Sequence, residues 1–143
     1  MKSIFSALIL LVACSTVSLA QCDKKVTLHS SKTQHLDSNG AVQETQDEQT
    51  TVQFDKSDIT VSITNPDHDE KMSGKIKSNT CNWNVPFKEG KTVLNTTLNN
   101  ENGEGRDFTL TIEGKNGKVT LMEESPSIPE KIKLDIEKFE AVN

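Results

Sequence analysis

FTLTIEGKNGKVTL, residues 108–121, decides the fold class of this chain. Its first five residues alternate between apolar and threonine side chains, which is the period of a β-strand with one buried face. Asn116-Gly117 follows, and this pair favours a two-residue type I′ turn because both central positions of that turn have positive φ. Such a turn pairs Ile112 with Leu121 and places both on one face. The stretch therefore predicts an antiparallel hairpin with one apolar side.

The same alternation recurs on both sides of this hairpin. The other runs that show it are residues 26–36, 42–54, 59–63, 72–76, 81–87, 94–98 and 132–136. Most are separated by short segments rich in Asn, Asp, Gly and Pro, which favour turns. About nine strands joined by short turns predict an all-β domain in which sequential neighbours pair as an antiparallel meander. An up-and-down barrel and a two-sheet sandwich both satisfy the pattern, and the short connections favour the barrel.

Three segments depart from this regular pattern. Between His29 and Thr51 almost no residue is apolar. We expect this hairpin to be either a solvated ribbon that projects past the core or a ribbon on which a protein partner docks. Residues 125–129, SPSIP, predict a rigid linker before the last strand. Phe139 departs by one residue from the parity of that strand, which predicts a bulge or a frayed end near Lys138.

The N-terminal segment has the pattern of an export signal. Residues 4–13, IFSALILLVA, form an apolar run that is too short to span a bilayer. Small residues at the end of the following segment predict a signal peptide over residues 1–20, which leaves residues 21–143 as a single β domain. The alternative is a lipobox that ends at Cys14, with this cysteine acylated and the protein anchored to the envelope. We expect an exported protein, secreted or periplasmic, with no transmembrane helix.

Either processing route leaves Cys22 and Cys81 as the two remaining cysteines. In an exported chain such a pair most often forms a disulfide. It would join the start of the mature domain to the middle of the sheet. A metal site or a redox pair is the alternative, but the chain has no C-x-x-C motif and no histidine near Cys81 in the sequence. We therefore predict no metal ligands and no cofactor.

Composition and motifs argue against several classes of function. The chain carries 16 Lys and Arg against 21 Asp and Glu, a formal net charge of −5. An acidic chain without a basic run is not expected to bind nucleic acid. It contains no G-x-S-x-G, H-E-x-x-H, P-loop or dinucleotide-binding fingerprint. We predict that the protein is not an enzyme, and the alternative is a catalytic site assembled across strands.

The histidines lack the arrangement of a metal or catalytic site. His29 and His35 share strand parity but are six residues apart, too far to bind one ion. His68 lies among three carboxylates in residues 67–70, which we interpret as a solvated acidic turn. Asn95, followed by two threonines, is a glycosylation acceptor if the host modifies exported proteins at this motif.

The inward positions of the best-patterned strands supply the candidate ligand-binding residues. They are Trp83, Val85, Phe87, Phe108, Leu110 and Ile112. These side chains would line either a packed core or an internal cavity. The leading hypothesis is an exported, non-catalytic β-domain that binds a small apolar ligand inside a barrel or a protein partner along the polar hairpin. The alternative is an envelope-anchored lipoprotein with a structural or interaction role.

Three short motifs carry a resemblance to a known class of proteins. They are the junction Ser18-Leu19-Ala20-Gln21, the tripeptide Cys81-Asn82-Trp83, and EGKNGK at residues 113–118. With them the chain resembles the small exported β-rich proteins of unassigned function from Bacteroidota, over most of its length, and the resemblance implies no particular activity. A lipocalin-like barrel is a second, fold-level analogy. The Gly-x-Trp that lipocalins carry near the first strand is absent, since the only tryptophan is Trp83.

Overall fold

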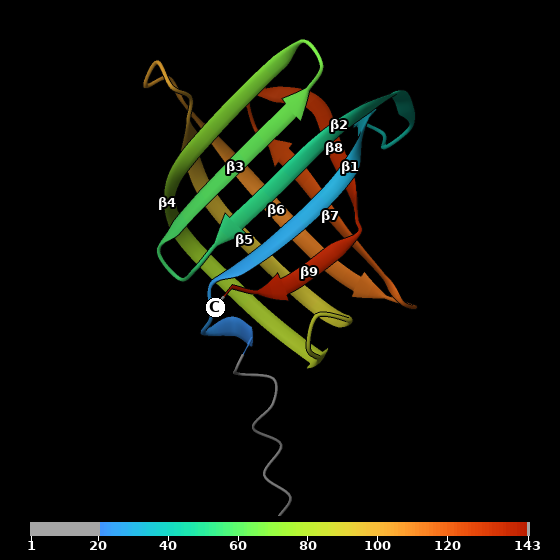
Figure 1. The fold of residues 1–143 in the computed structure, drawn as a ribbon, viewed down its shortest axis with the longest axis vertical. Coiled ribbons are helices and arrows are strands. Elements are labelled where there is room, and N and C mark those ends of the chain that lie inside the picture. Colours follow the sequence, from blue (N-terminus) through green and yellow to red (C-terminus); the bar gives the residue numbers. More distant parts are fainter. Residues whose placement is uncertain (1–20, 143) are drawn as a thin grey trace, which may run out of the picture.

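The computed structural model describes residues 21–142, and the predicted signal peptide, with Cys14, lies outside the described residues. Nine strands make up most of this part of the chain (Figure 1). They are β1 (Val26–Leu36), β2 (Val42–Phe54), β3 (Asp58–Asn65), β4 (His68–Val85), β5 (Glu89–Asn99), β6 (Gly105–Lys115), β7 (Lys118–Ser125), β8 (Ile128–Ile136) and β9 (Lys138–Ala141). The prediction of an all-β fold is confirmed.

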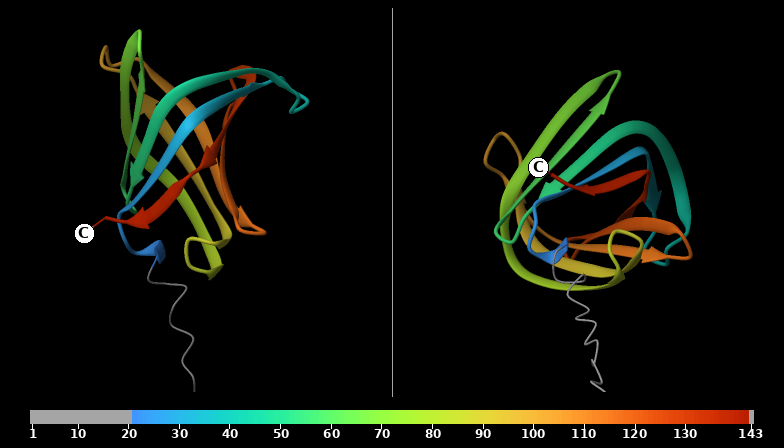
Figure 2. Two further views of the ribbon diagram at one scale, coloured as in Figure 1. Left: turned by 45° about the vertical axis from the view of Figure 1, so that its right-hand side comes forward. Right: turned by 60° about the horizontal axis from the view of Figure 1, so that its bottom comes forward.

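The strands form one antiparallel meander that closes on itself. Sequential strands from β1 to β8 pair with one another, and β1 also pairs with β8. Figure 2 shows the resulting closed wall of strands. The structure is an eight-stranded up-and-down barrel with one additional strand, so the barrel prediction is confirmed and the sandwich is wrong. Tight turns between sequential strands leave no segment long enough to cross from one sheet to another.

The hairpin over residues 108–121 has the predicted turn and register. Asn116 and Gly117 both have positive φ, at 53° and 76°. Ile112 pairs with Leu121 across β6 and β7, and both side chains are fully buried. The local prediction is therefore confirmed at the level of individual residue pairs.

Strand β4 differs from the prediction in its length. Residues 72–76 and 81–85, expected in two separate strands, are parts of one strand of 18 residues, and residues 86–87 lie beyond its end. Its register against β5 shifts between Ile76 and Ser78. A bulge at this point moves the inward parity by one residue. In the sequence such a shift has the same pattern as the end of one strand and the start of another.

A second register shift in β4 lies between Trp83 and Val85. Trp83 points into the barrel and is 1% exposed, whereas Val85 is 41% exposed. The prediction that Val85 continues the inward face is wrong, because this irregularity interrupts the alternation at the end of the strand. Gly90 pairs with Trp83 and has a φ of 151°, a conformation that glycine adopts most readily.

The last strand of the barrel is divided at Glu137. β8 pairs with the second half of β1, and β9 pairs with the first half. The backbone N–H of Glu137 donates to the carbonyl of His29 at 2.8 Å and bridges the break. The irregularity predicted near Lys138 is therefore confirmed. The rigid linker predicted at residues 125–129 is wrong, because β7 and β8 remain paired up to a two-residue turn.

One half of the barrel interior is filled by apolar side chains. This half lies toward the β2–β3, β4–β5 and β6–β7 turns, and its buried residues include Leu28, Phe54, Ile59, Trp83, Leu94 and Ile112. Phe139 of β9 packs edge-on against Trp83 and Phe87, with ring centroids 5.5 Å and 4.8 Å apart. This packed half is the closed floor of the barrel.

A disulfide between Cys22 and Cys81 attaches the segment before β1 to strand β4. The two Cα atoms are 6.0 Å apart. Gln21 lies beside the bridge, and its Oε1 accepts a hydrogen bond from the backbone N–H of Phe87 at 2.7 Å. The predicted pairing is confirmed, and it indicates a compartment other than the cytoplasm. Within residues 21–142 no helix is long and apolar enough to cross a bilayer.

Candidate functional site

The other half of the barrel interior contains a cavity of about 320 Å³. It lies beyond the packed floor, toward the β1–β2 and β3–β4 turns. Apolar side chains from six strands line its inner part: Val52, Val61, Ile63, Met72, Leu110, Leu121, Ile132 and Leu134. A volume of this size is at the small end of the range for ligand pockets in proteins.

Polar and charged side chains line the rest of the cavity. β1 and β2 contribute Thr33, His35, Gln46, Glu48 and Thr50, and β3, β4 and β7 contribute Asn65, His68, Glu70 and Glu123. Three of these residues are glutamates and two are histidines, and no described lysine or arginine is among them. The cavity is therefore apolar at its floor and acidic toward its mouth.

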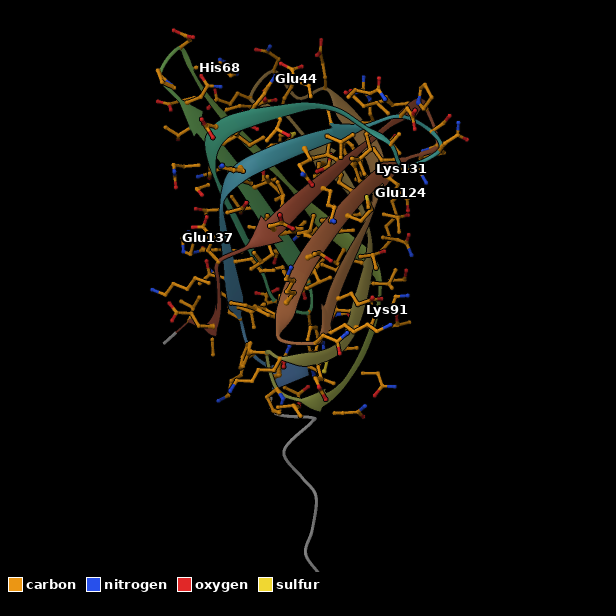
Figure 3. All side chains as sticks on the ribbon, turned by 90° about the vertical axis from the view of Figure 1, so that its right-hand side faces the viewer. Glu44, His68, Lys91, Glu124, Lys131 and Glu137 are labelled. Atoms are coloured by element: carbon orange, nitrogen blue, oxygen red, sulfur yellow. A yellow bond between two sulfur atoms is a disulfide. The ribbon has the colours of Figure 1, made fainter. Side chains whose placement is uncertain are left out.

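The mouth lies between the outer part of β2 and the β3–β4 turn. β2 and β3 pair only over residues 49–54 of β2, and a surface depression between the two segments shares Glu48, Asn65 and His68 with the cavity. Nδ2 of Asn65 donates to Oε2 of Glu48 across this depression at 3.5 Å, a long and weak hydrogen bond. Figure 3 shows His68 at this end of the molecule. A small molecule can enter here without breaking a strand pairing.

A bulge in β1 determines which of its polar residues face the cavity. The register against β2 shifts between Ser30 and Lys32, so the inward parity changes along the strand. His35, beyond the bulge, lines the cavity. His29, before the bulge, faces outward, and its Nδ1 is 3.0 Å from Oγ1 of Thr51. The prediction that the two histidines share a face is therefore wrong.

The polar hairpin over residues 29–51 does not project past the core as a solvated ribbon. Its inward side chains Ser30, Thr33, Glu48 and Thr50 are buried. Residues 38–45, at the tip and the outer portion of β2, form a continuous exposed stretch, and Lys32, Asp47 and Gln49 are exposed on the outer face. The solvated ribbon is therefore wrong for the rest of the hairpin, which is part of the barrel wall and whose polar inward face surrounds a cavity instead of an apolar core. Docking of a protein partner on the hairpin stays a prediction.

Three polar atoms of the cavity wall have no hydrogen-bond partner among the described residues. They are Oγ1 of Thr33 and of Thr50, in residues only 3% and 4% exposed, and Nε2 of His35. Nδ1 of His35 is 2.9 Å from Oε1 of Glu130, which orients the ring at the rim. A buried polar group without a partner costs about 1–3 kcal/mol. These three unsatisfied atoms belong to residues that line the cavity.

Glu123 lies in the cavity wall on β7. Burial, and to a smaller degree the charge of Glu70, raises the pKa of the Glu123 carboxyl from 4.5 to about 7. Besides Glu70 and Glu123, the titratable residues of the lining are Glu48, His35 and His68. The lining residues from β3, β6 and β8 are not titratable. Close to neutral pH the Glu123 carboxyl is therefore divided between its neutral and charged forms.

We expect Glu123→Gln to change how stability depends on pH. Because the pKa of Glu123 is higher in the folded than in the unfolded chain, its contribution to stability is greatest below about pH 4.5 and is lost as the pH rises through about 7. Relative to wild type, the variant should gain about 3 kcal/mol in unfolding free energy between pH 4 and pH 8. Urea unfolding at both pH values measures this difference. Glu124→Gln, the neighbouring carboxylate that is ion-paired with Lys131, is the control and should show less than about 1 kcal/mol.

No family model, curated protein or solved structure matches this chain. What the protein does must therefore be inferred from the cavity and its lining.

The six candidate ligand-binding residues are distributed over different parts of the barrel. Leu110 lines the cavity, whereas Trp83 and Ile112 are fully buried in the core, Phe87 and Phe108 pack partly buried against it, and Val85 is exposed. The six candidates include none of the polar residues of the mouth and, of the apolar residues of the lining, only Leu110. Strand parity is the sequence signal that could have found several of these polar residues, because they continue the inward alternation of the apolar residues beside them.

The remaining predicted features lie outside the cavity or at its edge. His68 is the first residue of β4 and not part of a turn, and its Nε2 is 3.7 Å from Oε2 of Glu70. In the part of the chain that the structure describes, no three His, Cys, Asp or Glu side chains are grouped to hold a metal ion. Asn95 is exposed on β5 and hydrogen-bonds Ser78 and Thr109 at 2.7 Å and 2.8 Å, and its glycosylation stays a prediction.

Proposed function

We propose that the protein is an exported, non-catalytic binding protein that carries a small amphipathic molecule inside its barrel. The observation that supports this proposal is the cavity, which combines an apolar floor with a polar mouth. A cavity lowers stability because its lining loses packing contacts. Buried hydroxyls without partners, at Thr33 and Thr50, add to that cost. A ligand offsets both costs when its apolar part contacts the floor and its polar end reaches these hydroxyls.

Export is the location that agrees with the disulfide between Cys22 and Cys81. A soluble secreted or periplasmic carrier would begin at Gln21 after removal of the predicted signal peptide. The envelope-anchored lipoprotein, with Cys14 acylated, is the second candidate. Mass spectrometry of the mature N-terminus separates the two, because Gln21 excludes the anchor and a diacylglyceryl group on Cys14 excludes soluble release.

Filling the cavity tests the binding proposal. We expect the neutral dye N-phenyl-1-naphthylamine to bind the wild-type protein with saturable fluorescence enhancement, since its rings fit an apolar interior. Ile63→Trp places a larger side chain in the cavity lining and should weaken dye binding about tenfold or more. Thr64→Trp adds the same side chain at the next, exposed position of β3 and should leave dye binding unchanged.

The proposal fails if wild type shows no saturable dye binding, or if Ile63→Trp binds as tightly as Thr64→Trp. Thermal unfolding of both variants verifies that each is folded at the temperature of the titration. Native mass spectrometry of protein released gently from its own host complements the titration. A bound small molecule of reproducible mass would identify the class of the natural cargo.

A further inference from the structure

We propose that the molecule carried is a cationic amphiphile, with an apolar body and a protonated amine in the acidic part of the cavity, which Glu48, Glu70 and Glu123 line. This inference rests on the proposed carrier function and names the chemistry of its ligand. It follows from three features of the mouth: its charge, its unpartnered hydroxyls and the limited volume below it.

The charge of the lining favours a cation. The three glutamates come from β2, β4 and β7, and no described lysine or arginine contributes to the cavity wall. The described hydrogen-bond partners of these carboxylates are weak or distant: Asn65 reaches Glu48 at 3.5 Å, and His68 lies 3.7 Å from Glu70. No described side chain makes a hydrogen bond or ion pair with Glu123. Carboxylates gathered without cations repel one another, and a bound ammonium group relieves that repulsion.

The unpartnered hydroxyls are an independent observation that points to a polar ligand atom. Oγ1 of Thr33 and Oγ1 of Thr50 are buried in the wall of the same cavity and lack partners among residues 21–142. A hydroxyl oxygen accepts hydrogen bonds, and an ammonium group has three N–H donors to share. The acidic side chains and the two threonines together therefore offer an amine both charge and hydrogen-bond acceptors.

The opposite ligand charge does not suit this cavity. A fatty-acid carboxylate would enter a mouth that already has three acidic side chains, with no described lysine or arginine in the lining to receive it. A neutral alcohol could satisfy the threonine hydroxyls but would leave the carboxylates unpaired. Because the cavity volume is about 320 Å³, a chain of roughly eight carbons is a better probe than a full-length lipid.

A matched series of ligands tests the inference on the purified protein. n-Octylamine, 1-octanol and octanoate have the same chain and differ in the head group, and the amine is protonated at pH 7 because alkylamines titrate near the pKa of lysine, about 10.4. Isothermal titration calorimetry at low salt should show octylamine binding about tenfold or more tightly than octanol. Octanoate should bind more weakly than both. The inference is wrong if octanoate binds as tightly as octylamine, or if octanol matches it.

Variants at two adjacent glutamates test whether the preference for octylamine depends on the carboxylates of the mouth. Glu123→Gln should reduce octylamine affinity about tenfold and change octanol affinity less than about twofold, because only the charged interaction is removed. Glu124→Gln, whose carboxylate pairs with Lys131, should change neither. An equal loss for both ligands in Glu123→Gln would overturn the assignment, since it would indicate altered packing.

The outcomes separate this inference from the proposed function. If none of the three eight-carbon ligands and no dye binds, the carrier function itself is wrong. If octanol and the dye bind but octylamine has no advantage, the carrier function stands and only the cationic ligand is wrong.

Discussion

Replacement of Trp83 by alanine is expected to lower the free energy of unfolding by about 4 kcal/mol, within the usual range for loss of a buried aromatic side chain. Trp83 is the largest side chain of the packed floor and is 1% exposed. Its Nε1–H donates to Oγ1 of Thr92 at 2.7 Å, and its ring meets Phe139 edge-on. Alanine removes the ring, the hydrogen bond and the aromatic contact, and it leaves a void beside the disulfide. Urea unfolding followed by circular dichroism measures the loss without relying on tryptophan fluorescence.

Trp83→Phe is the matched variant for this prediction. Phenylalanine retains part of the ring volume but cannot donate to Thr92, so the expected loss is smaller, about 1–2 kcal/mol. If Trp83→Ala lowers the free energy of unfolding by less than about 2 kcal/mol, the prediction is contradicted. That result would mean that the side chains of the packed floor move to fill the space left by the indole.

Two glycines explain how the barrel accommodates the indole. A Cβ at Gly90 would lie 2.8 Å from Cδ2 of Trp83, and a Cβ at Gly114 would lie 2.8 Å from Cζ3. Gly90 and Gly114 pair with each other on β5 and β6. The ring thus lies close to two neighbouring strands at positions where any side chain would displace it.

Removal of the disulfide has the second of the two largest expected effects. The bridge joins residues separated by 59 positions, and a loop of that length restricts the unfolded chain by about 4 kcal/mol in the chain-entropy description. We therefore expect Cys22→Ser combined with Cys81→Ser to lower the free energy of unfolding by up to about 4 kcal/mol. Urea unfolding of the double variant and of wild type, each with and without dithiothreitol, measures this loss.

The reductant provides an internal control. Wild type should fall to the stability of the double variant when dithiothreitol is present, and the double variant should not respond to it. A difference below about 1 kcal/mol between oxidised wild type and the double variant would contradict the prediction, and would mean that the unfolded chain is already compact without the bridge.

The parts of the fold that sequence predicts well are those set by neighbouring residues. Asn116 and Gly117 specify their own turn, and the turn then fixes the register from Ile112 to Leu121. The bulges in β1 and β4 are different, because each depends on pairing with a partner strand elsewhere in the chain. A parity break between apolar residues marks such a shift at Phe139, whereas the residues next to the bulge in β1 are polar and contain no apolar alternation that would mark it.

Most of the six candidate ligand-binding residues lie in the packed half of the barrel, and only Leu110 lines the cavity. Apolar inward residues such as Trp83 and Ile112 pack against one another and fill the floor. The cavity forms where the inward positions become polar. In β2 the parity of Val52 and Phe54 continues through Thr50 and Glu48, and in β7 the parity of Leu121 continues to Glu123. Extending the apolar parity into the polar parts of β2 and β7 predicts these residues of the lining, whereas in β1 the bulge changes the parity before Thr33 and His35.

The site also depends on distances that no sequence pattern contains. Thr33 and Thr50 come from adjacent strands, whereas Glu70 and Glu123 meet only because the wall curves until β4 and β7 face the same space. Closure of the barrel, and not any local motif, brings these groups together. The hairpin signal in residues 108–121 predicts a strand pair but not the curvature of the whole sheet.

The pairing of β1 with β8 and β9 also governs how the chain can reach its folded state. The last two strands pair with the first, so a chain in which only the earlier strands have formed has one free edge on β1 and another on its most recent strand. Pairing β1 with β8 and β9 closes a loop that contains nearly the whole domain. The entropic cost of this closure is large, so the pairing must form late. Because β1 and β8 both contribute to the cavity wall, no partial chain has a complete cavity. The cavity is therefore complete only after all eight strands of the barrel have formed and the exposed edges, which are prone to aggregation, have been joined.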